Sequence, residues 1–260
     1  MEARHARHEK PRHAKPIEEQ EKPKTPLFAA LIGVVGEVLI TISLVLGLFV
    51  FWQVVWTSWE VNRQLDQAVS QFDKALKPLP KQGNKLKIGE PRTDAPPVAK
   101  VDANGAPLGK LHVPRWNAIV PMAEGVGLDV INQGYAGHYP TTQALGEVGN
   151  FALAAHRLSY GNAFQYVHDL QVGDRIVAET SDAFFVYEVS SWEIVEPTQV
   201  EVLEPVPNQV GIQPTERLMT LTTCDPIWGN SHRYIVYTKY VHWVPRESGI
   251  PQELANTLKG

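Results

Sequence analysis

The stretch RLMTLTTCDPIWGNSHRYIVYTKYVHWV, residues 217–244, decides the fold class of this chain. Its two ends are rich in β-branched and aromatic residues, and its middle contains a proline and a glycine. Such a pattern predicts two antiparallel strands joined by a loop. If residues 225–232 form that loop, Cys224 and Arg233 lie opposite one another at its base.

Short β-prone segments of the same kind, separated by glycine-rich turns, fill the second half of the chain. Their number and spacing predict an all-β sandwich or closed barrel. One short helix, over residues 160–170, is expected among them because its apolar residues have helical spacing. The predicted strands cover residues 110–113, 118–122, 150–155, 175–178, 183–192, 217–223 and 233–244.

The N-terminal part predicts a membrane anchor. Residues 27–57 are apolar apart from Glu37 and Gln53, and about 20 residues at ~1.5 Å each suffice to cross a hydrocarbon core. The run is longer than the apolar part of a signal peptide and ends in aromatic residues, which is typical of an uncleaved anchor. Residues 1–26 carry seven Lys or Arg and no apolar pattern, so we expect a disordered cytoplasmic tail and an extracellular C-terminal part.

The part of the chain beyond the anchor divides further. Residues 58–109 predict a stalk helix over 58–77 and then a proline-rich linker that holds the next domain away from the bilayer. Residues 110–245 form the predicted β domain, and residues 246–260 form a C-terminal tail. Beyond Glu37 the chain carries 17 Lys and Arg against 22 Asp and Glu, which argues against a nucleic-acid-binding protein.

The single cysteine of the chain, Cys224, cannot form a disulfide within it, and one thiolate makes a poor metal site. Two roles remain for Cys224: it packs as an inert side chain, or it acts as a nucleophile. A thiol that attacks an amide needs a base and a group that stabilises the oxyanion. Arg233 could stabilise the oxyanion. His156 is the preferred base because it follows a predicted strand and precedes a loop. The other histidines of the β domain are His112, His138, His168, His232 and His242.

These residues resemble the signature of the sortases, membrane-anchored cysteine transpeptidases of Gram-positive bacteria. Residues 220–224 read TLTTC and are followed by Arg233, while residues 137–157 resemble the HYP…GN…AGHR region of the class E type of actinobacteria. Two departures occur, PTTQALG at residues 140–146 where many members read PGTALPG, and Ala155 in place of a glycine. The resemblance covers residues 108–245 and the anchor, and it implies a closed eight-stranded β-barrel.

The resemblance also implies a reaction. Cys224 would attack the threonine carbonyl of an LAxTG- or LPxTG-like sorting signal, His156 would transfer protons, and Arg233 would hold the substrate and the oxyanion. Thr223 would donate a hydrogen bond to the signal, and Tyr139 would form part of the wall that distinguishes Ala from Pro. Trp228 would line the site. The acceptor would be the amine of a lipid-linked peptidoglycan precursor. The predicted anchor and basic tail make the enzyme a single-pass protein of the cell membrane with its catalytic domain outside.

Two rival functions remain open. A pilin-polymerising sortase would use a lysine acceptor, and residues 78–109 could then serve as a lid over the site. A catalytically silent barrel would bind surface proteins without transferring them. No cofactor or metal is implied, although one group of glutamates resembles a calcium-binding loop of some sortases; we favour a solvated acidic surface for it. These residues are Glu188, Glu193, Glu196, Glu201 and Glu204.

Overall fold

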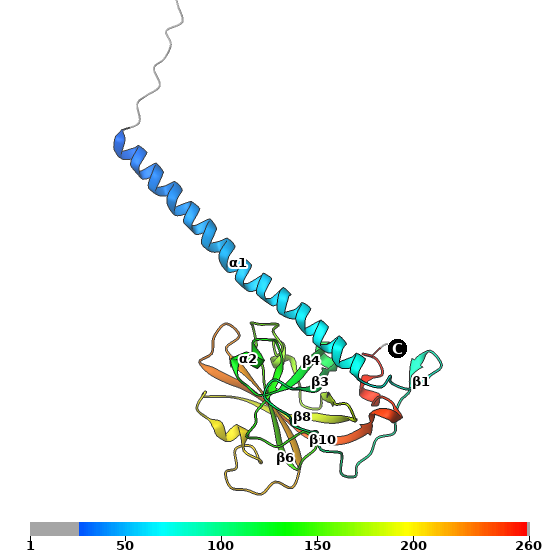
Figure 1. Cartoon of the computed structure of the whole chain (residues 1–260). Helices are drawn as coiled ribbons and strands as arrows, with labels where there is room; N and C mark the ends of the chain where they lie inside the picture. Colours follow the sequence, from blue (N-terminus) through cyan, green and yellow to red (C-terminus); the bar gives the residue numbers. More distant parts are fainter. Residues whose placement is uncertain (1–25, 259–260) are drawn as a thin grey trace, which may run out of the picture. The chain divides into compact units, whose positions relative to one another are not determined.

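A computed structural model describes residues 26–258 of the chain (Figure 1). Its first element, α1 (Leu27–Ala75), is one helix, and its residues Leu27–Gln53 are long and apolar enough to cross a membrane. The stalk helix expected from residue 58 is the continuation of α1. The basic tail expected over residues 1–26 lies outside the described residues except for Pro26. The chain divides into two compact units between Phe49 and Val50.

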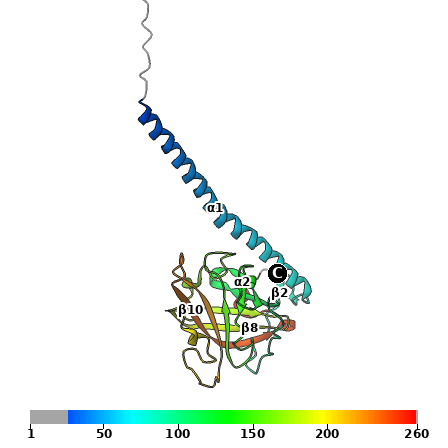
Figure 2. The same ribbon diagram turned by 60° about the vertical axis from the view of Figure 1, so that its left-hand side comes forward.

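Eight strands in residues 26–258 close into the expected barrel (Figures 1 and 2). Their order around the barrel is β10-β8-β7-β3-β4-β5-β6-β9, and neighbours are antiparallel except for the parallel pairs β4–β5 and β6–β9. The strands are β3 (Pro107–Val113), β4 (Ala118–Glu124), β5 (Ala136–His138), β6 (Gly149–Ala154), β7 (Arg175–Glu179), β8 (Ala183–Val195), β9 (Arg217–Asp225) and β10 (His232–Pro245).

Alternate residues along the strands fill the barrel. On β9, Met219 and Leu221 are fully buried in the main apolar core, as are Phe151 and Leu153 on the neighbouring β6. Because successive side chains of a strand point to opposite faces, the residues between them face outward. The outward set on β9 includes Thr220, Thr222 and Cys224, so the cysteine belongs to the outer face of the barrel.

The seven predicted strands are all present, most of them one to three residues longer than expected. The eighth strand, β5, was missed because it has only three residues and a glycine at its centre. The helix expected over residues 160–170 is wrong: only the 3-10 turn η2 (Val167–Asp169) forms there. Tyr160, Gly161 and Asn162 all have positive φ angles, which a right-handed helix cannot accommodate. The short α2 (Leu128–Ile131) lies elsewhere, between β4 and β5.

The proline-rich segment is not the free spacer that its composition predicts. After the short hairpin β1 (Lys81–Gln82) and β2 (Lys85–Leu86), the chain follows the barrel surface. Arg92 pairs with Trp243 on β10 through the backbone and places its guanidinium 4.7 Å from the indole ring. Ala99 donates a backbone hydrogen bond to Leu145, ahead of β6. Proline fixes an extended backbone, and here that backbone is held by neighbouring strands and loops.

The predicted C-terminal tail also packs on the barrel. Ile250 and Leu254 are fully buried in a second apolar cluster with residues of β7, β8 and β10. Ile250 forms a parallel bridge with Ile88 of the proline-rich segment. The segment contains two turns, η4 (Arg246–Ser248) and η5 (Gln252–Leu254); Ile250 lies between them, and Leu254 ends the second. The proline-rich segment and the C-terminal residues therefore contact each other and pack on the barrel.

A buried charge cluster joins the last turn of α1 to the barrel. Glu179 on β7 is 1% exposed and contacts Lys110 (3.0 Å), His112 (2.7 Å) and Arg246 (3.2 Å). Lys110 also pairs with Asp73 of α1. Burial alone would raise the pKa of Glu179, but the hydrogen bond and charge of His112 and the charge of Lys110 outweigh it and lower the pKa to about 2.

We expect Glu179→Gln to lower the free energy of unfolding of the barrel by about 3 kcal/mol at pH 7, because the buried cations Lys110 and Arg246 lose their shared anion. The contribution of a carboxylate with a lowered pKa is complete above its unfolded value and is lost as pH falls through the folded one. The difference from wild type should therefore shrink between about pH 4.5 and pH 2. Urea unfolding of the full chain in detergent, followed by near-ultraviolet circular dichroism, measures it.

The control for this variant is Glu188→Gln, which breaks an exposed pair with Arg175. It should cost less than about 1 kcal/mol. Equal losses for the two variants at pH 7 would contradict the importance of the buried cluster.

Candidate active site

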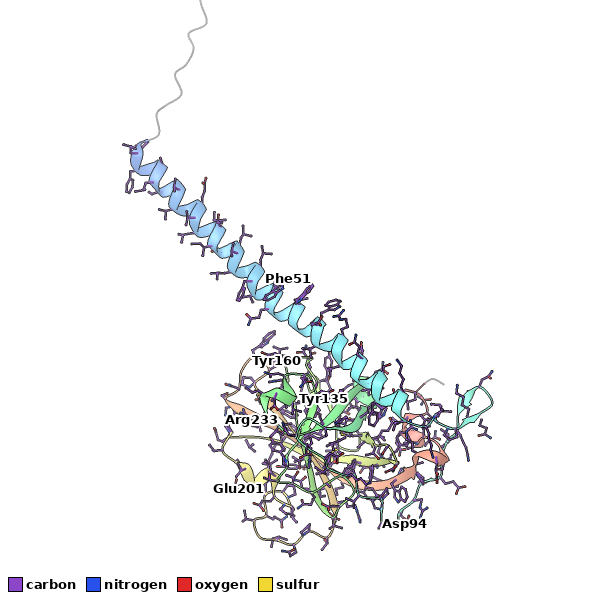
Figure 3. All side chains as sticks on the ribbon, viewed as in Figure 1. Phe51, Asp94, Tyr135, Tyr160, Glu201 and Arg233 are labelled. Atoms are coloured by element: carbon purple, nitrogen blue, oxygen red, sulfur yellow. The ribbon has the colours of Figure 1, made fainter. Side chains whose placement is uncertain are left out.

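The strand registers bring Cys224, His156 and Arg233 to one end of the barrel. Cys224 is the register partner of Arg233 in the antiparallel pair of β9 and β10. The parallel pair of β6 and β9 ends with Ala154 opposite Thr222, so two residues further along each strand lie His156 and Cys224. Figure 3 shows Arg233 at this end of the barrel and Asp94, on the proline-rich segment, far from it.

Cys224 is half-buried at the end of β9. Its neighbours on the outer face of the barrel are Thr222 on the same strand and Ile235 on β10, the register partner of Thr222. The thiol is therefore at the end of an outward-facing row of side chains, where an extended peptide could reach it along the strands.

His156 is held from two sides in the loop that follows β6. Asn132 Oδ1 lies 2.8 Å from its Nε2, and the ring of Tyr160 lies 5.3 Å from the imidazole. Because an amide oxygen can only accept, the neutral imidazole carries its proton on Nε2 and leaves Nδ1 as the free base. Burial lowers the pKa of His156, since it disfavours the charged ring. Asn132 was missed in the sequence because it lies on a different loop, 24 residues upstream.

Arg233 is fixed by the hairpin loop. Its Nη1 donates to the carbonyl oxygens of Asn230 and His232, each at 2.9 Å. Asp225, the carboxylate at the other end of the same loop, pairs with Arg157. The guanidinium of Arg233 thus keeps donors for a ligand at the strand position beside the thiol.

Arg157 is a second residue that the sequence did not single out, although it directly follows His156. Its Nη1 donates to the carbonyl oxygen of Cys224 (3.2 Å) and to the carboxylate of Asp225. Its guanidinium lies 5.4 Å from the ring centre of Tyr234. Arg157 therefore links the loop of the histidine to the strand end of the cysteine.

The other histidines considered as bases lie in different surroundings. His138 is buried, bonds Glu124 at 2.7 Å through Nδ1, and stacks on Phe151 with ring centres 4.7 Å apart. His168 is exposed beside Asp169 on the turn η2. Neither lies at the end of β9.

The three residues expected to contact a peptide differ in their placement. Tyr139 is near the outward row, and its hydroxyl lies 3.0 Å from Thr222 Oγ1. Thr223 is buried and faces inward, and its hydroxyl already donates to the Ala155 carbonyl at 2.7 Å, so it supports the loop of His156 instead of presenting a donor outward. Trp228 lies on the loop after Cys224 with its side chain 82% exposed.

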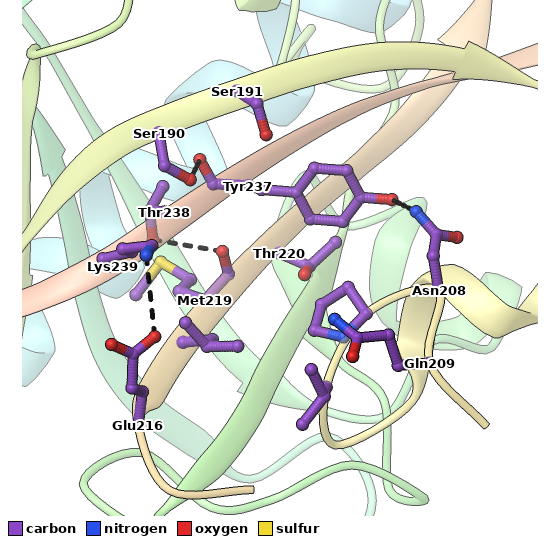
Figure 4. A pocket seen from close by; sticks show the side chains of 13 residues that line it. Ser190, Ser191, Asn208, Gln209, Glu216, Met219, Thr220, Tyr237, Thr238 and Lys239 are labelled. Carbon is purple, nitrogen blue, oxygen red and sulfur yellow. Dashed lines mark hydrogen bonds and ion pairs between the residues drawn. The ribbon is translucent and has the colours of Figure 1, made fainter. Parts of the chain in front are cut away.

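A pocket of about 320 Å³ lies further along the same outer face (Figure 4). Asn208 donates to the Tyr237 hydroxyl at one side of it, and Lys239 pairs with Glu216 at the other. Cys224, His156 and Arg233 do not line this pocket. Among residues 26–258, no group of three His, Cys, Asp or Glu side chains is placed to hold a metal ion.

Comparison with known proteins assigns the family. Residues 111–241 match the model of the sortase domain. The chain belongs to the sortase family. Sortase SrtE1 of Streptomyces coelicolor is 35% identical over 85% of this chain, which spans 60% of that relative's length. This similarity and the structural matches below support class E.

Two solved sortases share the fold. SrtA of Actinomyces oris is 47% identical, with a TM-score of 0.61, over 63% of this chain and 96% of that one. Sortase E1 of Streptomyces coelicolor, solved with a tripeptide in its active site, is 38% identical, with a TM-score of 0.54, over 60% of this chain and 99% of that one.

The surroundings of His156 predict its titration. In a Cys224→Ala variant, which removes coupling to the thiol, His156 should titrate below the ordinary value of 6.5 because burial disfavours the imidazolium. NMR of the histidine ring protons in detergent-solubilised full chain measures this pKa. A measured pKa of His156 at or above 6.5 would contradict the account.

Proposed function

We propose that this sortase is a membrane-anchored cysteine transpeptidase that cleaves an LAxTG- or LPxTG-like signal between Thr and Gly. It then joins the cleaved protein to a cell-wall amine. The observation that carries the proposal is the alignment of Cys224, His156 and Arg233 by two strand registers, on the outer face of the barrel. This set supplies the nucleophile, the base and the oxyanion donor that acyl transfer requires.

In the first step, the sulfur of Cys224 attacks the threonine carbonyl while Nδ1 of His156 takes the thiol proton. The carbonyl oxygen gains negative charge, which Arg233 stabilises with its guanidinium. The tetrahedral intermediate then collapses: the C–N bond breaks, His156 returns the proton to the glycine nitrogen, and a thioester remains on Cys224.

In the second step, an incoming amine attacks the thioester carbonyl. His156 removes a proton from that nitrogen, the new C–N bond forms, and the C–S bond breaks to release the sulfur of Cys224. Water in place of the amine would give hydrolysis. The lowered pKa of His156 suits it to act as a base near neutral pH.

The outward row of β9 is the proposed floor for the sorting signal. Tyr139 and Thr222 would form the part that contacts the second residue of the signal, Ala or Pro, because their hydroxyls lie together two residues from Cys224 along β9. Trp228 is exposed on the adjacent loop and would cover the bound peptide. For Thr223, whose hydroxyl has an internal partner, we propose support of the His156 loop.

The proposed partners are secreted proteins with such C-terminal signals and a lipid-linked peptidoglycan precursor. The apolar part of α1 would anchor the enzyme in the cell membrane, with the N-terminus inside and the barrel outside. We propose an enzyme without a cofactor, and a calcium ion at the acidic loop is the alternative. The alternative is a pilin-polymerising enzyme in which residues 78–109 form a lid; within that segment, Ile88, Arg92 and Ala99 pair through the backbone with Ile250, Trp243 and Leu145.

The test uses the full chain in detergent with fluorogenic LAxTG and LPxTG peptides. Cleavage should be lost in Cys224→Ala, and kcat/KM should fall at least about 10²-fold in Arg233→Ala, the scale of losing an oxyanion donor. Cleavage that survives in Cys224→Ala would contradict the proposal. Complete alkylation of Cys224 without any peptide turnover would instead indicate a silent binding barrel.

A further inference from the structure

One face of the second half of α1 is covered by another part of the chain. Val61 is only 8% exposed, and Leu65, one turn later, is partly buried. Both residues belong to the compact unit Val50–Gly260, which also contains the barrel. Residues four apart lie on the same face of a helix, so the two side chains point in the same direction. This face of α1 therefore packs within the barrel unit.

The segment that this face touches contains Gly134, between α2 and β5. A Cβ atom added to Gly134 would lie 2.6 Å from Cδ1 of Leu65 and 2.9 Å from Cγ1 of Val61. Carbon atoms in contact stay about 3.5 to 4.0 Å apart, so the two side chains occupy the space that a Cβ would need. The φ angle of Gly134 is 86°, which also favours glycine. The helix therefore touches the backbone of this turn directly.

The same turn ends α2 and carries Asn132. The Asn132 amide donates to the Leu128 carbonyl at 3.1 Å, and the Gly134 amide donates to the Ile131 carbonyl at 3.0 Å. These bonds make both residues part of one hydrogen-bonded turn. From it, Oδ1 of Asn132 reaches Nε2 of His156 at 2.8 Å. The contact with α1 thus lies two residues from the group that orients the base.

The short helix α2 cannot hold this turn in place by itself. It has four residues and no side-chain cap at its N-terminus, and a helix of this length is not stable without packing. Its residue Val130 is buried, which fixes the middle of the helix. At its C-terminal end, where Asn132 lies, Val61 and Leu65 pack on Gly134. The position of Asn132 therefore depends on α1.

We propose that Val61 and Leu65 of α1 are positioning residues for His156 in the sortase reaction. The inference rests on the proposed function. Their side chains fix the turn at Gly134, and the turn fixes Asn132. Asn132 keeps the imidazole proton on Nε2, so that Nδ1 is free to take the proton of the thiol or of the incoming amine. The helix that carries the membrane anchor thereby also orients the catalytic base.

Steady-state kinetics of the full chain in detergent test this role. In Leu65→Ala, kcat for a sorting peptide should fall about fivefold, the effect of one hydrogen bond, because the turn no longer holds Asn132 against His156. The KM for the peptide should keep its wild-type value, since Leu65 is not part of the proposed peptide floor. Val61→Ala, a smaller truncation on the same face, should act in the same direction, and it replaces Leu65→Ala if that variant does not fold.

Leu76→Ala is the matched control. Leu76 is also partly buried, but it lies about 15 Å further along the chain, past the end of α1, and lines a different pocket with Trp243. Its truncation should leave kcat unchanged. A double-mutant cycle isolates the route of the effect. In an Asn132→Ala background, which already lacks the hydrogen bond to His156, Leu65→Ala should lower kcat no further.

A spectroscopic measurement tests the same link without any substrate. NMR of the imidazole nitrogens of His156, assigned by comparison with His156→Gln, distinguishes the two neutral tautomers. The wild type and Leu76→Ala should show the tautomer with the proton on Nε2. Leu65→Ala should show a mixture with the Nδ1 tautomer, because Asn132 no longer selects one form.

The outcomes separate this inference from the proposed function. If the wild type cleaves no sorting peptide, the proposed function fails, and the tautomer measurement still decides whether α1 orients His156. If Leu65→Ala keeps the wild-type kcat and tautomer, or if its effect on kcat persists in the Asn132→Ala background, α1 does not position the base. An equal fall of kcat in Leu76→Ala would also refute the inference, because the loss would then reflect the stability of the whole barrel unit.

Discussion

The parallel pairing of β6 with β9 is the constraint on which the site depends. Parallel strands end at the same edge of a sheet, so the residues that follow β6 emerge beside the end of β9. The ladder continues past the strand, where the Ala155 amide donates to the Thr222 carbonyl at 3.2 Å. That bond fixes the position of His156 relative to Cys224 through the backbone alone.

Side-chain hydrogen bonds also hold the loop of His156 against the strand of Cys224. Thr223 donates to the Ala155 carbonyl, and Arg157 donates to the Cys224 carbonyl, so the residues on both sides of His156 are bonded to the strand of the cysteine. Arg157 is 7% exposed, and its charge is matched by Asp225 and the face of Tyr234. Such a network preserves geometry between two loops that could otherwise move independently.

The sequence predicted the parts that depend on local pattern. β-branched runs indicated seven of the eight strands, and the TLTTC segment with Arg233 indicated the hairpin and, through resemblance, the sortase family. The placement of Cys224 opposite Arg233 followed from the loop length between them. Each of these features lies within a short stretch of chain, where the alternation of apolar and polar residues and the turn residues are sufficient to predict the structure.

The features that could not be predicted from the sequence depend on contacts between segments that are distant along the chain. Asn132 reaches His156 from a loop before β5, a strand too short to have a periodic signal. The inward orientation of Thr223 follows from the alternation of β9, yet its partner Ala155 depends on which strand pairs with β9. The proline-rich segment looked like a spacer because its composition resembles one, and only the barrel surface supplies its partners.

We propose that Cys224, placed by the register of β6, β9 and β10, carries the acyl group. Intact-mass and peptide mass spectrometry of the full chain, quenched in acid shortly after addition of a sorting peptide, tests it most directly. The account predicts an adduct with the mass of the signal up to its threonine, on the fragment that contains Cys224, and its disappearance when an amine is added. Formation of product without any such adduct, or an adduct on another residue, would contradict it.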